Sequence, residues 1–191
     1  FNFSSAQEVY LNVGRNFTTY DYTNSQGEEN PNIESSSGAS YEVGYIFPMG
    51  DKFGIAAGFT LDQYNATGGN LVNNYSWNTN YLGLQGMARY TVIDSDRAPF
   101  AVNLKAGINF NHIISGEQKI NGQTFKLTGE DEFKGLFIKP VFGLDVQYFL
   151  LDDIAISMGY NFSKNFGLSS SDEELNFNNS QLQFGILMSL N

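Results

Sequence analysis

Apolar and polar residues alternate along most of the chain, and a period of two is typical of β-strands. The pattern predicts eight strands, separated by segments rich in Asn, Ser, Gly and Asp. The predicted strands are 8–20, 39–48, 53–64, 78–91, 99–111, 134–148, 153–164 and 180–191. No change in composition divides the chain, so we expect a single domain over residues 1–191.

The connections between these strands alternate between long and short. The long connections are 21–38, 65–77, 112–133 and 165–179, and the short ones are 49–52, 92–98 and 149–152. If the strands run up and down beside one another, all long loops lie at one end and all short turns at the other. With eight strands, both termini then lie at the short-turn end.

The two faces of each predicted strand differ in character. One face is almost wholly apolar, as Val43, Tyr45 and Phe47 illustrate, and Arg15 has the same parity toward the long-loop end of the first strand. The other face is small and polar, and it holds the strand glycines with the exception of Gly86. A closed sheet therefore has one apolar and one polar side.

Alternation alone does not say which face is inside, because a soluble lipocalin-like barrel turns its apolar face inward and a membrane barrel turns it outward. Glycine on the polar face favours the membrane barrel, since eight strands enclose little room. The strands also reach the roughly 9–11 residues that cross a bilayer on a tilt. Aromatic residues near strand ends fit the girdles at the membrane interfaces. They are Tyr41, Phe47, Phe53, Tyr64, Tyr90, Phe100, Phe110, Tyr148 and Phe162.

This architecture, including the alternating last strand QLQFGILMSLN over 181–191, resembles the small outer-membrane β-barrels of Gram-negative bacteria, of the OmpA transmembrane domain, OmpX and OmpW type. The resemblance covers roughly residues 8 to 191. It implies an all-β fold, an eight-stranded antiparallel up-and-down transmembrane β-barrel, in the cell outer membrane. It also implies periplasmic termini and short turns, extracellular long loops, and outer-membrane lipid and lipopolysaccharide as surroundings.

Composition narrows the function. The 20 acidic and 10 basic residues give a net charge of −10, which opposes nucleic-acid binding because phosphate neutralisation needs Lys and Arg. The chain has no Cys, and therefore no disulfide, thiolate metal site or Cys nucleophile. We expect no cofactor and no metal, because no segment has their motif spacing. The mean hydropathy of −0.26 averages two opposed faces and the polar loops.

Charged residues on the polar face are the sharpest feature, and they are Glu42, Asp62, Arg89, Lys105, Lys139 and Asp145. The height of each charge in the barrel can be approximated by counting residues from the short-turn end of its strand. At each of three heights, one acid and one base are expected. The shared heights predict three ion pairs, namely Asp145–Arg89, Glu42–Lys105 and Asp62–Lys139. Because a buried charge is tolerated only when it is paired, we expect these residues to plug the lumen rather than to line a selective pore.

Two further features carry weaker chemistry. His112, the only histidine, precedes Ser115, and some small outer-membrane barrels are lipid-modifying enzymes that use a His and a Ser. A catalytic base also needs a nucleophile within reach and an orienting acid, and no such spacing is present, so we predict no catalytic residues.

Acidic side chains concentrate in the long loops, where they can be solvated or can bind divalent cations or a basic partner. They are Glu28, Glu29, Glu34, Glu130, Asp131, Glu132, Asp172, Glu173 and Glu174.

Together these features predict a non-enzymatic outer-membrane barrel that is structural, or an accessory subunit of a larger outer-membrane protein complex, with acidic extracellular loops. A narrow, OmpW-like conduit for small solutes is the principal alternative. A lipid-modifying enzyme and a soluble lipocalin-like binder are two others.

Overall fold

The computed structural model describes residues 7–23, 33–69, 74–94, 99–128, 135–167 and 174–190. The strands in these ranges are β1 (Gln7–Thr23), β2 (Ile33–Pro48), β3 (Phe53–Gly69), β4 (Asn74–Ile93), β5 (Phe100–Ile120), β6 (Gln123–Lys126), β7 (Leu136–Phe149), β8 (Ile154–Gly167) and β9 (Glu174–Leu190). None of the described residues forms a helix long and apolar enough to cross a membrane.

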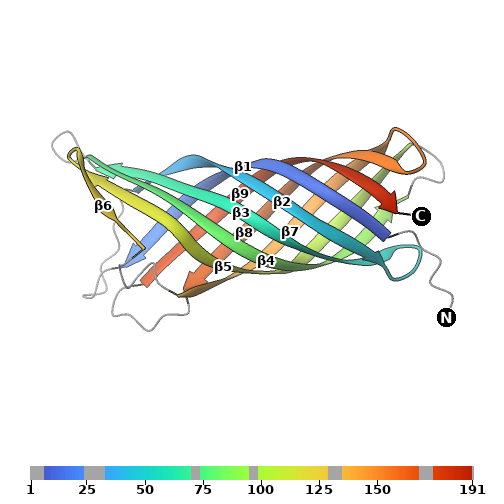
Figure 1. The fold of residues 1–191 in the computed structure, drawn as a ribbon, viewed down its shortest axis with the longest axis horizontal. Helices are drawn as coiled ribbons and strands as arrows, with labels where there is room; N and C mark the ends of the chain where they lie inside the picture. The colour runs from blue at the N-terminus through green and yellow to red at the C-terminus, as the bar shows by residue number, and fades with distance from the viewer. Residues whose placement is uncertain are drawn as a thin grey trace.

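The strands form a closed antiparallel barrel, which confirms the predicted fold class. The sheet order is β4-β3-β2-β1-β9-β8-β7-β5-β6, and a further pairing of β4 with β5 closes the ring (Figure 1). Every strand except β6 belongs to this ring, and β6 pairs only with the far end of β5. The seam between β1 and β9 pairs Gln7 with Leu190 and continues without interruption to Thr23 and Glu174.

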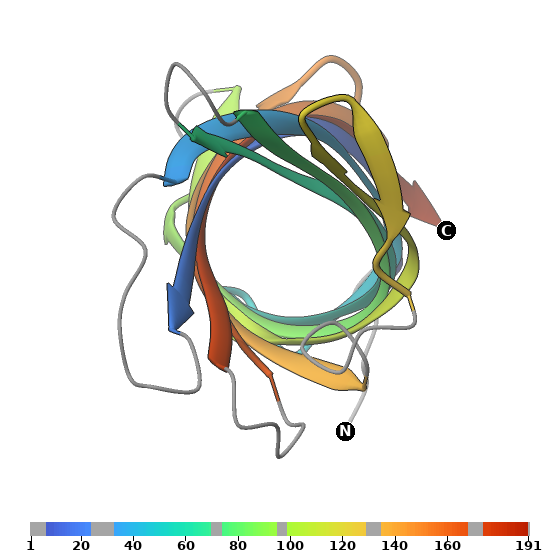
Figure 2. The same cartoon turned by 90° about the vertical axis from the view of Figure 1, so that its left-hand side faces the viewer.

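The ends of the barrel differ as the loop lengths predicted. The start of β1 and the end of β9 lie at the end that carries the turns between β2 and β3 and between β7 and β8 (Figure 1). The β5–β6 hairpin lies at the opposite end, where it leans beside the mouth of the barrel (Figure 2). The strands alternate in direction, so the chain runs up and down around the ring.

Several strands continue further toward the long-loop end than predicted. β5 runs to Ile120 and then folds back as β6, so the predicted loop 112–133 is largely a hairpin. The polar residues in these extensions are typical of loops, so composition alone predicts loop there. Their backbones nevertheless pair with neighbouring strands. Cross-strand side-chain bonds support this pairing: Asn80 Nδ2 donates to Ser115 Oγ at 3.0 Å.

The apolar face lies outside, as predicted, and this excludes the lipocalin-like arrangement. Large apolar side chains on the barrel strands are widely exposed, including Phe59, Leu84 and Phe142 at 61%, 54% and 62%. Such an uncharged surface requires lipid rather than water around it. One residue of the predicted aromatic girdles was placed wrongly: Tyr64 is fully buried inside the barrel.

Interior glycines leave room for the residues of the neighbouring strand. A Cβ at Gly107, on the inner face of β5, would overlap the carbonyl oxygen of Gly86 and lie 2.6 Å from the Cα of Met87. A Cβ at Gly86, on the outer face of β4, would meet nothing within 4 Å. Gly107 and Met87 face each other across the same strand pair.

We therefore expect Gly107→Ala to lower the free energy of unfolding by about 1–3 kcal/mol, because the added methyl overpacks against backbone that cannot yield. Gly86→Ala is the matched control and should leave stability unchanged or slightly raised, since it only restricts the unfolded chain. Urea unfolding of the refolded barrel in detergent micelles measures both. Equal stability of the two variants would contradict the close-approach argument.

Candidate functional site: the interior of the barrel

A buried ion pair crosses the lumen in its long-loop half. Lys139 Nζ, from β7, lies 2.9 Å from Asp62 Oδ2, from β3, and the two side chains are 4% and 1% exposed. Asp62 also accepts bonds from Asn16 Nδ2 at 3.1 Å and Gln181 Nε2 at 3.3 Å. The predicted pairing of Asp62 with Lys139 is thus present in the structure, and neutral donors surround the acid.

An aromatic layer lies directly beyond this ion pair toward the long loops. It consists of the inward-facing rings of Tyr20, Tyr64, Tyr81, Phe137 and Phe177, each at most 4% exposed. Phe177 lies at its centre, with ring centroids at 4.8 Å from Tyr64 and 5.1 Å from Tyr20. Lys139 Nζ donates to Tyr64 Oη at 2.7 Å, so the ion pair and the aromatic layer are one connected plug.

The hairpin end covers the aromatic layer. Leu127, which follows β6, is 2% exposed and packs into the same cluster, together with Ile113 of β5. The backbone N–H of Leu127 donates to Gly116 O at 2.9 Å, which returns the chain to the mouth. Figure 2, which views this end, shows an open ring of ribbon, but these side chains fill it.

Glu42 lies nearer the short turns and has no basic partner among the residues that the structure describes. Four neutral donors bind its carboxylate: Tyr10 Oη at 2.8 Å, Gln85 Nε2 at 2.6 Å, Gln183 Nε2 at 2.9 Å and Asn12 Nδ2 at 3.4 Å. The predicted pairing of Glu42 with Lys105 is therefore wrong. The two residues belong to strands on different walls, β2 and β5, and the stagger of the strands places another acid closer to Lys105.

The other two basic residues of the lumen also have partners that differ from those predicted. Lys105 Nζ lies 3.5 Å from Asp145 Oδ1. Arg89, which the count paired with Asp145, instead reaches Glu8 Oε2 at 3.2 Å and also donates to Gln147. Arg89 and Lys105 are direct cross-strand neighbours, although counting from the predicted strand ends placed them at different heights. Sequence reasoning missed Glu8, which sits on the inner face at the start of the first predicted strand.

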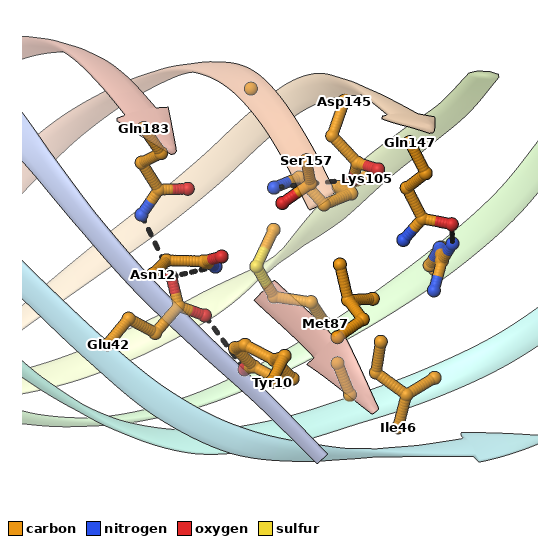
Figure 3. A pocket seen from close by; sticks show the side chains of 14 residues that line it. Tyr10, Asn12, Glu42, Ile46, Met87, Lys105, Asp145, Gln147, Ser157 and Gln183 are labelled. Carbon is orange, nitrogen blue, oxygen red and sulfur yellow. Dashed lines mark hydrogen bonds and ion pairs between the residues drawn. The ribbon is translucent and has the colours of Figure 1, made fainter. Parts of the chain in front are cut away.

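A cavity of about 40 Å³ remains beside these charges (Figure 3). Tyr10 and Gln183 converge on Glu42 on one side of it, and Lys105 and Asp145 lie on the other. Nearer the mouth, a second cavity of about 110 Å³ is lined by Glu8, Lys52 and other residues of the short-turn end. Arg89 lines both cavities and so lies between them.

Among the residues with described positions, no nucleophile and acid are bonded to the histidine. His112 lies on the outer face of β5, and its Nδ1 is 2.9 Å from Gly135 O. Ser115 Oγ is hydrogen-bonded to Asn80, and the acids of 130–132 fall outside the described residues.

Of the acidic loop residues, Glu34 is exposed on β2, whereas the side chains of the others are outside the described part. No cluster of three potential metal ligands occurs among the described residues.

Comparisons with known proteins agree with this geometry. The model of the outer membrane protein beta-barrel domain matches residues 2–186. The solved structure of OprG from Pseudomonas aeruginosa is similar at 10% identity with a TM-score of 0.65, covering 98% of this chain and 97% of that one. Neisserial surface protein A is similar at 14% identity with a TM-score of 0.56, covering 95% and 97%. No curated protein matches the sequence significantly.

Because the Asp62–Lys139 pair is buried, removing one partner should cost more than removing both. We expect Lys139→Met to lower the free energy of unfolding by about 3–5 kcal/mol, since Asp62 is left as an uncompensated buried charge. The double variant Asp62→Asn/Lys139→Met should recover most of this loss. Lys52→Met, at an exposed turn residue, is the control and should stay within about 0.5 kcal/mol of wild type. Additive losses in urea unfolding would refute the coupling.

Proposed function

Because the chain belongs to the outer membrane protein beta-barrel domain family, we propose that it is a non-conducting, non-enzymatic outer-membrane barrel that acts as a structural or accessory subunit of a larger outer-membrane assembly. Membership of this family places it in the outer membrane. In the proposed orientation, the termini and short turns face the periplasm. The β5–β6 hairpin and the acidic loops face outward, where lipopolysaccharide or a protein partner is available to them.

The filled lumen is the observation that carries this proposal. A solute moving along the axis would have to separate Asp62 from Lys139 and then pass five rings that are almost completely buried. Breaking a buried ion pair leaves an unpaired charge, which is strongly unfavourable. With the axis closed, what remains for recognition is the outer surface and the ends, which suits a scaffold better than the alternative of a narrow conduit.

Conductance in planar bilayers tests the closed lumen. We expect the wild-type barrel to insert without producing ion-conducting steps at moderate voltage. A variant in which Asp62, Lys139, Tyr64 and Phe177 are each replaced by Ser should conduct if it remains folded, because the ion pair and the central rings of the aromatic layer are then removed. Reproducible wild-type conductance would favour the conduit instead.

Cysteine labelling tests the orientation, because the chain has no cysteine of its own. Thr124→Cys lies on exposed β6, and Asp152→Cys lies on the exposed turn between β7 and β8. On intact Gram-negative cells, a membrane-impermeant maleimide should modify position 124 and spare position 152 until the outer membrane is permeabilised. The reverse pattern would overturn the proposed topology.

The assembly itself is tested by mild-detergent extraction from native membranes, followed by native electrophoresis and mass spectrometry. A stable complex with a second outer-membrane protein is the expected result. Recovery of the barrel alone, after both mild extraction and crosslinking, would contradict the accessory role.

A further inference from the structure

At the cavity between Glu42 and Lys105, the acceptor atoms of Glu42 are fully bonded, whereas some donor atoms of the basic residues are not. The carboxylate of Glu42 already receives four donors, two on each oxygen. A carboxylate has about four lone-pair sites, so Glu42 has little capacity left for a guest. Its negative charge is also shared among four dipoles that point toward it.

The basic groups at the same cavity are not saturated. An ammonium group has three donors, and among the described residues Lys105 has one partner, Asp145, at 3.5 Å. Arg89 Nε is buried and has no hydrogen-bond partner, although the guanidinium also contacts Glu8 and Gln147. Among the described residues, the free donors at the cavity are therefore on the cations Lys105 and Arg89, while the carboxylate of Asp145 accepts from Lys105 and from Asn103 Nδ2 at 3.0 Å.

The two cations lie close together in the sheet. Arg89 and Lys105 are paired directly across β4 and β5. Like charges at directly opposed positions destabilise a sheet. Their side chains lean apart toward different acids, Glu8 and Asp145, and both line the cavity that lies between them and Glu42.

We propose that this cavity binds a small anion of carboxylate size, held by Lys105 and Arg89. The volume of about 40 Å³ suits a group equivalent to a few water molecules and no larger ligand. Ser157, from β8, adds a hydroxyl to the wall. The anion enters from the short-turn end through the cavity of about 110 Å³, past Arg89, which lines both spaces. The site is independent of the proposed scaffold role, since it requires no passage through the plug.

Acetate and its neutral isostere acetamide provide the direct test. In spectra of the refolded, isotopically labelled barrel in micelles, acetate should produce saturable shifts at the backbone amides of Ser157 and Gly159, and acetamide should not. Lys105→Gln should weaken acetate binding about tenfold, because a hydrogen bond to a charged group is lost. Lys105→Arg should retain binding, and Lys164→Gln, on the outer side of β8, should leave it unchanged.

No saturable acetate shift, equal shifts with acetamide, or undiminished affinity in Lys105→Gln would each overturn the proposal. A second measurement covers the case in which Lys105→Gln does not fold. The chain lacks cysteine, so Ser157→Cys places one thiol on the cavity wall and Ser115→Cys places one on the exposed outer rim.

Iodoacetate and iodoacetamide are nearly equal in size and differ in charge. The ratio of their alkylation rates should favour iodoacetate at position 157 about tenfold more than at position 115, because the cavity concentrates the anion. A ratio at position 157 equal to or below that at position 115 would exclude an anion site.

Discussion

Eight strands closed into one ring enclose room for side chains but for little water, and this restriction governs every inward-facing residue. A charge in that space must find its compensation within hydrogen-bond distance. Asp62 obtains it from a lysine on the far wall, and Glu42 obtains it from four neutral donors. Glycines such as Gly107 leave room on the inner face for Met87 of the neighbouring strand. The pairing of interior charges and the use of glycine at some interior positions are two responses to the same narrow cross-section.

The faces of the strands follow from the sequence because side-chain direction alternates strictly along a strand. Each inward charge was therefore placed on the correct face. The partners of those charges depend on register and stagger, which pairing between strands sets and which no single strand encodes. Only the Asp62–Lys139 pair was identified correctly. Arg89 and Lys105 are direct neighbours in the barrel, which counting from the ends of separate strands did not show.

Local composition is a weak guide where segments that contain polar residues form strands. Polar residues such as Asn74, Ser115 and Gln118 favour a loop in the extensions of β4 and β5, but these extensions pair with each other, and Ser115 Oγ accepts a bond from Asn80. The aromatic layer was missed for a related reason. Phe177 lay outside the predicted strand 180–191, and Tyr64 was assigned to the membrane interface by its position near a strand end, although its parity placed it inside. The odd or even position of a residue along its strand was the stronger signal, because it determines whether the side chain points into the barrel. Nearness to a strand end indicates only the height of the residue along the barrel axis.

The uninterrupted seam between β1 and β9 has a consequence for the order of folding. It joins Gln7 to Leu190, so the contacts that close the ring are also the most distant along the chain, and contacts of this kind form slowly. Until β9 docks, β1 presents a row of unpaired backbone groups that hydrocarbon does not tolerate. Closure and complete insertion are therefore coupled, and neither can precede synthesis of the final strand. Both β1 and β9 must therefore be at the membrane before the ring closes.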